Sequence, residues 1–237
     1  MTDVRARVVC LPYSGGSGFA YRQWPPLGDG VDVLPLDYPG HPLRPDEPLK
    51  HSVPDLVADL TEALRGVWDK PFALCGTSLG ALVAFELARV AEAAGRAPAV
   101  VVLAACAAPS RLPRHPPVSD RDDEAFLAAI AGRYGGAAVG LAADPDARDW
   151  LLPALRADIR AFETYRGAEA APIAADLIVA SGQDDGSVGF GDVAAWRSFT
   201  TGTCRVLSVP GDHFFLLDQP HEVVGELGSR LRTGTRP

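Results

Sequence analysis

The run from Phe72 to Ala81, Phe-Ala-Leu-Cys-Gly-Thr-Ser-Leu-Gly-Ala, constrains the fold of this chain more than any other stretch. A short apolar segment ends in Gly-x-Ser-x-Gly, and an alanine- and leucine-rich segment with helical spacing follows at once. This order predicts a strand, a sharp turn and a helix, with Ser78 at the turn. Bare Gly-x-Ser-x-Gly also occurs by chance in glycine-rich loops, but the strand before it and the helix after it favour the turn.

The predicted turn would present the Ser78 hydroxyl for chemistry. The backbone at Ser78 must be strained, so side chains two positions away must be very small, and Gly76 and Gly80 meet that demand. The hydroxyl is then lifted clear of the sheet. The first free amides of the following helix point at whatever the hydroxyl attacks.

Apolar strand-like segments alternate with helical segments over most of the chain. Strands are predicted at residues 7–11, 31–36, 72–76, 99–104, 176–181 and 203–209, and helices at 81–94, 193–199 and 219–231. A further helix should begin at Ser52 and bury one face, formed by Leu56, Leu60, Ala63, Leu64 and Val67. Alternation of this kind predicts the α/β class, with a doubly wound, mostly parallel sheet.

The alternation breaks between the fourth and fifth predicted strands. Residues 107–117 are proline-rich, and helical segments follow at 122–134 and within 144–166 with no strand between them. Helices inserted at such a point are typical of a lid over an active site. A separate small domain is the alternative, but this segment is short and alanine-rich, so we expect it to bury no core without the sheet. We therefore predict a single domain over 1–237, with its core at about 1–107 and 170–237 and a lid at about 108–169.

Three candidate catalytic side chains follow the ends of predicted strands. A serine hydroxyl needs a base within hydrogen-bond reach, and the base needs an orienting carboxylate. Ser78, then Asp184 or Asp185, then His213 occur in the order that this kind of sheet requires. We favour Asp185 as the acid because of its place in the loop, with the neighbouring Asp184 left open. The predicted chemistry is two-step acyl transfer through an acyl-serine.

Two other polar residues near these positions are set aside. His41 precedes the nucleophile in the chain, which is the wrong order, so we interpret it as a loop histidine. Asp212, beside His213, is interpreted as a turn former.

A glycine-rich stretch, Pro-Tyr-Ser-Gly-Gly-Ser-Gly at 12–18, follows the first predicted strand. The patterns of phosphate-binding and dinucleotide-binding loops are missing from it. A loop at this position supplies one amide of the oxyanion hole in hydrolases with a serine at such a turn. We therefore predict that the backbone amides of Ser14 and Leu79 bind the oxyanion, with Tyr13 as the next candidate after Ser14 and a plain tight turn as the alternative.

Composition excludes several other classes. The net charge of −8 argues against general nucleic-acid binding, and no apolar run approaches the about 20 residues of a membrane span. The polar start lacks the pattern of a signal peptide, so we expect a cytoplasmic protein. The four cysteines have no metal-site spacing and lie in apolar runs, which predicts buried free thiols and no metal or other cofactor: Cys10, Cys75, Cys106 and Cys204.

Taken together, these residues resemble type II thioesterases, the free-standing editing hydrolases of polyketide and nonribosomal peptide synthases. The resemblance covers nearly the whole chain. It is carried by 11–17 (Leu-Pro-Tyr-Ser-Gly-Gly-Ser), Pro-Gly at 39–40 with Arg44 and Glu47-Pro48, 71–89, 152–158 (Leu-Pro-Ala-Leu-Arg-Ala-Asp), Tyr165, Trp196 and 211–216. It implies an α/β-hydrolase fold with a helical lid, with Ser78 as nucleophile, His213 as base and Asp185 as acid.

The resemblance also implies a substrate. Acyl groups would arrive on the phosphopantetheine arm of an acyl or peptidyl carrier protein, and the usual task is to hydrolyse stalled or aberrant thioesters. Three positions depart from the family pattern: Thr77 replaces a usual histidine, Leu79 a usual methionine, and Asp212 a usual glycine. A product-releasing or cyclising role, a general serine esterase and an inactive binding partner are the alternatives.

Carrier proteins are generally acidic, and so is this chain, which we expect to act as a monomer. Docking then needs a local basic patch, and Arg111, Arg114 and Arg121 are the candidates. Scattered, solvated charges are the alternative interpretation.

Overall fold

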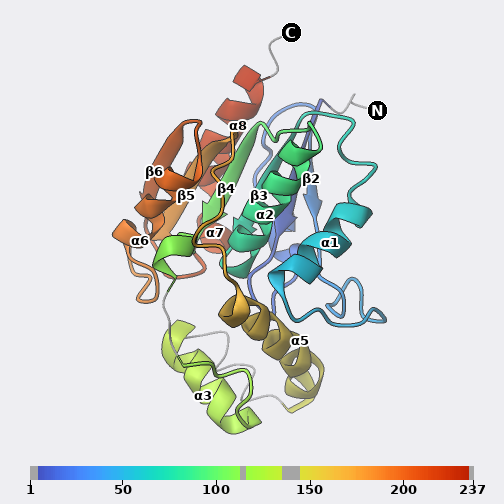
Figure 1. Ribbon diagram of the computed structural model, residues 1–237, viewed down its shortest axis with the longest axis vertical. Coiled ribbons are helices and arrows are strands. Elements are labelled where there is room, and N and C mark those ends of the chain that lie inside the picture. The colour runs from blue at the N-terminus through green and yellow to red at the C-terminus, as the bar shows by residue number, and fades with distance from the viewer. Residues whose placement is uncertain (1–4, 113–115, 135–144, 235–237) are drawn as a thin grey trace.

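The fold is built on one parallel sheet of six strands (Figure 1). The computed structural model describes residues 5–112, 116–134 and 145–234. The strands lie in the order β2-β1-β3-β4-β5-β6, and every neighbouring pair runs parallel. Their bounds are β1 Ala6–Leu11, β2 Val31–Pro35, β3 Phe72–Thr77, β4 Val100–Ala104, β5 Asp176–Gly182 and β6 Cys204–Val209. The six predicted strands are therefore confirmed, and no end differs from its predicted position by more than one residue.

The order of the strands places a switch point between β1 and β3. From β1 the chain moves to the edge strand β2, and it then returns to the other side of β1 to form β3. In open parallel sheets, sites collect outside the carboxyl ends of the strands at such a switch point. The glycine-rich loop 12–18 follows β1 and Ser78 follows β3, so the topology brings these two segments together.

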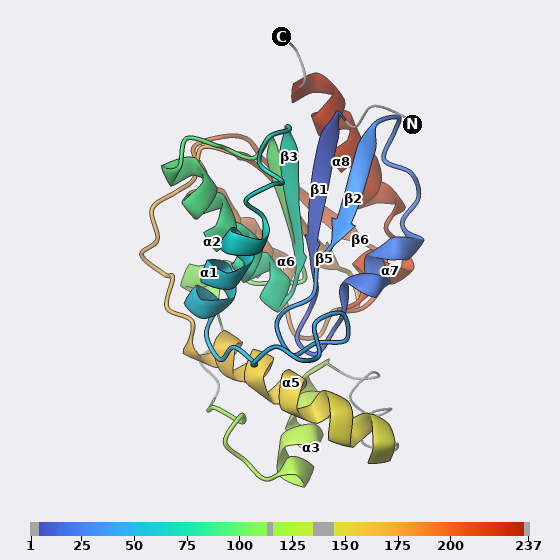
Figure 2. The same cartoon turned by 90° about the vertical axis from the view of Figure 1, so that its right-hand side faces the viewer.

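Helices cover both faces of the sheet (Figure 2). One face carries α1 Val53–Ala63 and α2 Leu79–Ala93, and the other carries α8 His221–Gly234 and the short α7 Phe215–Asp218. The remaining elements are α3 Asp123–Tyr134, α5 Pro145–Thr164, α6 Phe190–Ala194 and the 3-10 turns η1 Gly18–Gln23, η2 Pro109–Arg111 and η3 Ala195–Phe199.

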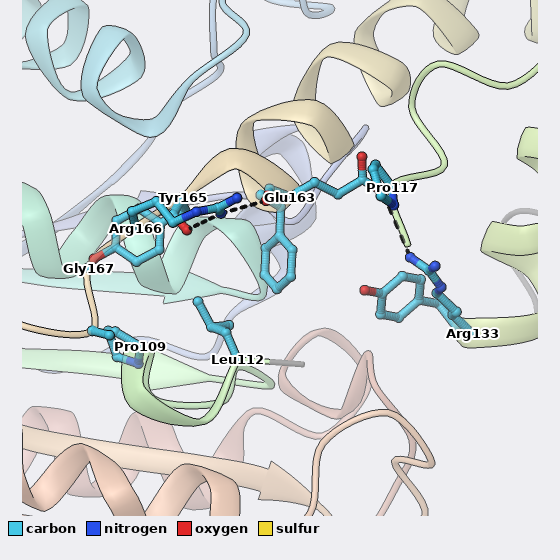
Figure 3. Close-up of a pocket in the computed structure, with 11 residues that line it drawn as sticks. Pro109, Leu112, Pro117, Arg133, Glu163, Tyr165, Arg166 and Gly167 are labelled. Carbon is cyan, nitrogen blue, oxygen red and sulfur yellow. Dashed lines mark hydrogen bonds and ion pairs between the residues drawn. The ribbon is translucent and has the colours of Figure 1, made fainter. Parts of the chain in front are cut away.

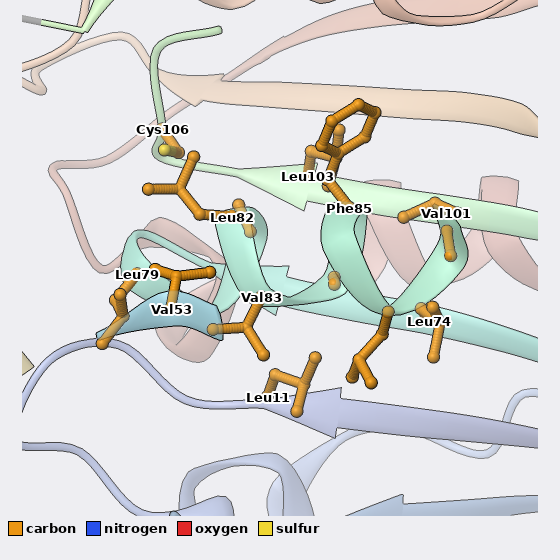
Figure 4. Close-up of a cluster of buried hydrophobic side chains, with 14 of the residues drawn as sticks. Leu11, Val53, Leu74, Leu79, Leu82, Val83, Phe85, Val101, Leu103 and Cys106 are labelled. Carbon is orange, nitrogen blue, oxygen red and sulfur yellow. The ribbon is translucent and has the colours of Figure 1, made fainter. Parts of the chain in front are cut away.

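Helix α2 is the best-buried helix of the core. Ten of its 15 residues are buried, so little of its surface is left for solvent. Figure 4 shows how Leu82, Val83 and Phe85 of this helix lie among side chains of β1, β3 and β4. This packing holds α2 rigidly in place. Because α2 begins directly after Ser78, the turn at Ser78 is held rigidly as well.

Helix α1 shows where periodicity alone misplaces a buried face. Ser52 caps it as predicted, its hydroxyl accepting a hydrogen bond from the Asp55 amide at 3.2 Å. Ala63 is exposed rather than buried, and Val53 and Val57 are buried instead. Because Val53 and Val57 belong to the buried face, its centre lies at a different angle around the helix axis than predicted, and Ala63 lies at its edge.

Helices α3 and α5 lie beyond the carboxyl ends of the strands (Figures 1 and 2). They share a small hydrophobic cluster that is separate from the two clusters on the sheet, formed by Val118, Phe126, Leu127, Ile130, Leu152, Leu155 and Ile159. The expectation that the inserted segment buries no core without the sheet stays a prediction, because this cluster is seen with the sheet present. Near its C-terminus, α5 also packs against the main hydrophobic core through Ala161. The hydroxyl of Tyr165, directly after α5, donates a hydrogen bond to the Glu86 carboxylate of α2 at 2.7 Å.

Within the described ranges, no helix has the length and apolar character that crossing a membrane requires. Of the four cysteines, three are buried as predicted and Cys204 is only half-buried. Burial raises the pKa of the Cys10 and Cys106 thiols well above the ordinary range.

Candidate active site

Ser78 lies at a strained turn between β3 and α2. Its φ of 56° and ψ of −117° place it in a region that residues other than glycine rarely adopt. A Cβ at Gly76 would come within 1.9 Å of the Gly80 carbonyl oxygen, and a Cβ at Gly80 within 2.3 Å of the Leu11 carbonyl oxygen. Only hydrogen fits at either position, which is the physical reason for the glycines of the Gly-x-Ser-x-Gly pattern. The Ser78 amide donates to the carbonyl of Ala104 in β4 at 2.8 Å and anchors the turn.

His213 lies in the loop after β6, where it meets the loop after β5. Its Nδ1 is 2.8 Å from Oδ2 of Asp185, and both side chains are buried, with exposed fractions of 6% and 1%. The two loops pack so closely that a Cβ at Gly182 would lie 2.3 Å from the Asp212 carbonyl oxygen. Asp212 itself accepts a hydrogen bond from the Phe214 amide at 2.8 Å, which confirms its interpretation as a turn former.

Asp185, rather than Asp184, contacts the histidine. Asp184 is exposed, and its carboxylate makes no hydrogen bond to the residues that the structure describes. Oδ1 of Asp185 accepts hydrogen bonds from the Ser187 amide at 2.8 Å and the Ser187 hydroxyl at 2.6 Å. Burial alone would raise the pKa of Asp185, but the hydrogen bond and charge of His213, with the two bonds from Ser187, lower it.

Ser187 is a residue of this site that sequence reasoning missed. Its hydroxyl also lies 3.1 Å from Nδ1 of His213, so it bridges the carboxylate and the ring. The signal in the sequence is an aspartate followed two residues later by a serine, because an aspartate side chain commonly accepts from the backbone amide two residues on.

The hydrogen bonds of His213 determine which ring nitrogen carries the proton. Nδ1 faces the Asp185 carboxylate, an acceptor, so the proton of the neutral ring lies on Nδ1. Nε2 has no hydrogen-bond partner among the described residues, and its lone pair is therefore available for a proton. The ring is held by Tyr134 and Phe214, whose ring centroids lie 4.9 and 5.4 Å from that of His213.

Ser78 and His213 line the same small cavity, of about 20 Å³. That volume holds about one water molecule. The wall is completed by Ala105, Cys106, Ala107, Leu112, Tyr134, Phe162, Ser187 and Val188. The structure thus brings the serine and the imidazole to one space, without a hydrogen bond between them.

The amides at this end of the sheet complete the site. The closeness of Gly80 to the carbonyl oxygens of Leu11 and Pro12 packs the start of α2 against the start of the loop 12–18. Neither the Ser14 amide nor the Leu79 amide donates a hydrogen bond to any group in the described ranges. Leu79 begins α2, and the free amides of a helix N-terminus favour negative charge.

Two buried tyrosines, which sequence reasoning also missed, hold the beginning of this loop. The Tyr21 hydroxyl donates to the Leu11 carbonyl at 2.7 Å and lies 2.9 Å from Oγ1 of Thr77, next to Ser78. The Tyr38 hydroxyl donates to the Pro12 carbonyl at 2.9 Å. Thr77 thus has a structural partner at the position where the resemblance leads one to expect histidine.

A larger cavity of about 240 Å³ adjoins the small one (Figure 3). The two share Leu112, Tyr134 and Phe162, which separate the larger space from Ser78. The larger cavity is otherwise lined by Pro109, Pro117, Arg133, Glu163, Tyr165, Arg166, Gly167 and Ala168. In Figure 3, Arg133 and Arg166 lie on opposite sides of it, and the Glu163 carboxylate between them lies 4.0 Å from the Arg133 guanidinium.

Comparison with known proteins identifies the family. The family model described as "Thioesterase domain" matches residues 6–231. The chain belongs to the thioesterase family. It is 36% identical over 228 residues to Thioesterase PikA5 of Streptomyces venezuelae, covering 95% of this chain and 80% of that protein.

Solved structures of thioesterases share its fold. The chain superposes on ClbQ from the colibactin NRPS/PKS pathway with a TM-score of 0.88 at 28% identity, covering 97% of this chain and 98% of that one. It superposes on the RedJ thioesterase of the prodiginine pathway in Streptomyces coelicolor with a TM-score of 0.85 at 32% identity, covering 95% and 90%. The predicted α/β-hydrolase fold is therefore confirmed, and this thioesterase is a thioester hydrolase.

Proposed function

We propose that this thioesterase hydrolyses acyl thioesters carried on the phosphopantetheine arm of acyl or peptidyl carrier proteins, and that it clears stalled or aberrant acyl groups from a polyketide or nonribosomal peptide synthase. Ser78 is the nucleophile, His213 the base and Asp185 the orienting acid. One observation carries the assignment: His213 is fixed by Asp185 through Nδ1 and shares a cavity with the strained Ser78.

The first half of the reaction forms an acyl-enzyme. The Ser78 hydroxyl gives its proton to Nε2 of His213 as its oxygen attacks the thioester carbonyl carbon. The amides of Ser14 and Leu79 donate to the carbonyl oxygen while it carries negative charge. The carbon–sulfur bond then breaks, and the imidazolium of His213 returns the proton to the departing sulfur. The carrier leaves as a free thiol, and the acyl group remains as an ester of Ser78.

The second half releases the acid. A water molecule in the space left by the thiol loses a proton to Nε2 of His213 and attacks the ester carbon. The same amides stabilise the second oxyanion, the carbon–oxygen bond to Ser78 breaks, and the serine oxygen regains its proton from His213. Throughout, the negative charge of Asp185 stabilises the imidazolium, and its hydrogen bond holds the ring in orientation. No cofactor takes part in these steps.

Three observations support the carrier-bound substrate and the lid. Relatives with this fold are named for such pathways, among them the type II thioesterase YbtT of the yersiniabactin NRPS/PKS pathway. The cavity of about 240 Å³ lies behind the wall that Leu112, Tyr134 and Phe162 form with the small cavity at Ser78, and the apolar side chains of that wall could contact an acyl chain. Helices α3 and α5 lie across the carboxyl ends of the strands, the place that a lid must occupy. Of the arginines proposed for carrier docking, Arg111 and Arg121 are exposed, and Arg114 lies outside the described residues.

The test compares three substrates on the wild-type protein. An acyl-loaded carrier protein, the same acyl group on a small free thiol, and a small oxygen ester are followed by mass spectrometry of the carrier and release of the acid. Editing predicts faster turnover of the carrier thioester than of the ester. Equal rates favour a general esterase, and a cyclic product favours a releasing enzyme.

Ser78→Ala is the matched negative control. It should lower turnover by about 10⁴-fold or more, whereas Ser198→Ala, at an exposed serine of η3, should leave turnover unchanged. Wild-type protein that neither turns over thioester nor reacts with a fluorophosphonate at Ser78 would instead be a binding partner without activity.

A further inference from the structure

A second carboxylate–imidazole pair lies apart from the small cavity at Ser78, between α5 and the loop after β2. Nε2 of His41 is 3.0 Å from Oδ2 of Asp158, and each side chain is only 1% exposed. His41 is in a loop, as predicted from the sequence, but it is a buried and paired residue rather than a surface one. Its partner, Asp158, ends the Leu-Pro-Ala-Leu-Arg-Ala-Asp segment of α5.

The hydrogen bonds of His41 differ from those of His213 in one decisive way. Nδ1 of His41 lies 3.2 Å from the Pro39 carbonyl oxygen, so both of its ring nitrogens face acceptors. Acceptors on both sides of a ring favour its doubly protonated, positively charged form. His41 therefore has no lone pair to offer as a base, and it serves as a fixed cation for Asp158.

The charges around His41 favour this state. Burial by itself would lower the pKa of His41, but the hydrogen bond and charge of Asp158, the Pro39 carbonyl and the Asp37 carboxylate together raise it. The only other titratable group that the structure places against the ring is Tyr38, which packs edge-on at 5.5 Å between centroids. Both carboxylates that act on the ring thus favour the imidazolium.

Asp158 extends from this pair to the glycine-rich loop. The same Oδ2 accepts a hydrogen bond from the Gly15 amide at 2.7 Å. Gly15 has a φ of +71°, and a Cβ there would lie 3.0 Å from Leu155 on α5. The Gly15 amide belongs to the peptide plane that also contains the Ser14 carbonyl, so the bond to Asp158 fixes the backbone on one side of Ser14.

Oδ2 of Asp158 makes the hydrogen bonds to both His41 and Gly15, and Oδ1 makes none within the described part of the chain. Its Oδ1 is the one buried side-chain oxygen or nitrogen in the described ranges that has no hydrogen-bond partner. A buried, unpaired carboxylate oxygen is costly, and this cost offsets part of what the two bonds of Oδ2 contribute to stability. Its place between α5 and the oxyanion loop offers a functional reason to retain this carboxylate.

We propose that Asp158, held by the protonated His41, is a positioning residue that docks α5 onto the loop 12–18 and sets the Ser14 amide for the oxyanion. This inference rests on the proposed function, because it assigns a role in that reaction. It also couples the helices over the site to the oxyanion hole: when α5 leaves, the Gly15 amide loses its acceptor and the Ser14 peptide is released.

The test measures both turnover and the rate at which a fluorophosphonate labels Ser78. Labelling needs the same amides, which bind the phosphoryl oxygen, but it needs no acyl carrier, so a wrong substrate assignment leaves this readout intact. Asp158→Asn removes the charge at nearly constant shape, and His41→Gln keeps one donor without the cation. A displaced oxyanion donor should lower kcat and the labelling rate by about 10- to 100-fold in Asp158→Asn, with a smaller loss in His41→Gln and KM changed much less than kcat.

Glu92→Gln is the matched control. Glu92 also accepts from backbone amides, those of Ala174 and Ala175 at 2.8–2.9 Å, but it lies at the other end of α2, remote from Ser78. It should label at nearly the wild-type rate. The proposal is overturned if folded Asp158→Asn labels as fast as wild type, or if Glu92→Gln slows labelling equally. Should Asp158→Asn not fold, His41→Gln decides, and a wild-type labelling rate in that variant refutes the proposal.

Discussion

Replacing Asp185 by asparagine is an informative test of the site, because the hydrogen-bond partners of Asp185 determine the orientation of the asparagine side-chain amide. Oδ1 accepts from both the amide and the hydroxyl of Ser187, whereas Oδ2 faces Nδ1 of His213. An asparagine at 185 would therefore direct its oxygen toward the amide and hydroxyl of Ser187, which both donate, and its NH₂ group toward the His213 ring.

An NH₂ group opposite Nδ1 reverses the tautomer of the histidine. Nδ1 must then accept, the ring proton moves to Nε2, and Nε2 becomes a donor that cannot take the proton of the Ser78 hydroxyl. Restoring the working tautomer requires the amide to flip, which sets its NH₂ against the Ser187 amide and costs about 1–3 kcal/mol for the buried donors left unpaired. Loss of the carboxylate charge, which stabilises the imidazolium, adds to this. A wrong tautomer in a serine–histidine–aspartate site lowers kcat by about 10⁴-fold, or about 5 kcal/mol in activation free energy.

The assay is steady-state hydrolysis of a small acyl thioester, with urea unfolding to show that Asp185→Asn is folded. Asp184→Asn is the matched control, because its exposed carboxylate has no contact with His213; its kcat should stay within about twofold of wild type, since exposed positions contribute little. A folded Asp185→Asn with more than a tenth of wild-type kcat would refute this reasoning.

Three further predictions concern stability and are measured by urea unfolding. Gly80→Ala should lower the free energy of unfolding by about 3 kcal/mol, because its methyl group would lie 2.3 Å from the Leu11 carbonyl oxygen, whereas Gly132→Ala, in open space on α3, should raise it by about 0.5–1 kcal/mol. The lowered pKa of Asp185 predicts a contribution that is fully present above its ordinary pKa and disappears as the pH falls through the lowered value, so wild type and Asp185→Asn should converge in acid. The raised pKa of His41 has the opposite sign: its contribution is full below its ordinary pKa and is lost as the pH rises through the raised value, so wild type should lose its advantage over His41→Gln in alkali. A pH-independent difference in either comparison would contradict the assigned ion pair.

The sheet and the turn at Ser78 were predictable because their causes are local. The spacing of apolar residues within a short window predicts a strand or a helix. The turn requires a glycine two positions before Ser78 and another two positions after it. The ranges of α2 and the six strands therefore agree with the pattern to within one or two residues. The pairing of Asp185 with His213 followed from a second rule, that the loops after parallel strands meet at one edge. That rule names the loop but does not choose between adjacent aspartates; the structure distinguishes them, because Asp185 lies 2.8 Å from Nδ1 of His213 and Asp184 is exposed.

The features that sequence reasoning missed depend on contacts between distant segments. Gly15 and Asp158 are 143 positions apart, and Asp158 lies on a helix whose place over the sheet no periodicity encodes. The contacts of Tyr21 and Tyr38 could not be predicted for the same reason, because the sequence around an isolated tyrosine does not indicate which distant carbonyl its hydroxyl will contact. The cluster between α3 and α5 was missed for a related reason, since its seven members come from three separate segments.

The two histidine–aspartate pairs show why residue type and chain order do not settle a role. His41 and His213 are both buried and both bound to a carboxylate at about 3 Å. They differ in the second ring nitrogen: that of His41 meets a carbonyl, whereas that of His213 is left without a described partner beside Ser78. The contacts of the first ring therefore favour the cation, and the second ring keeps a lone pair that can accept a proton. In the proposed function, the missing hydrogen bond at Nε2 is what allows His213 to act as a base. The second hydrogen bond of His41 leaves that ring to hold Asp158, which accepts from the Gly15 amide of the glycine-rich loop.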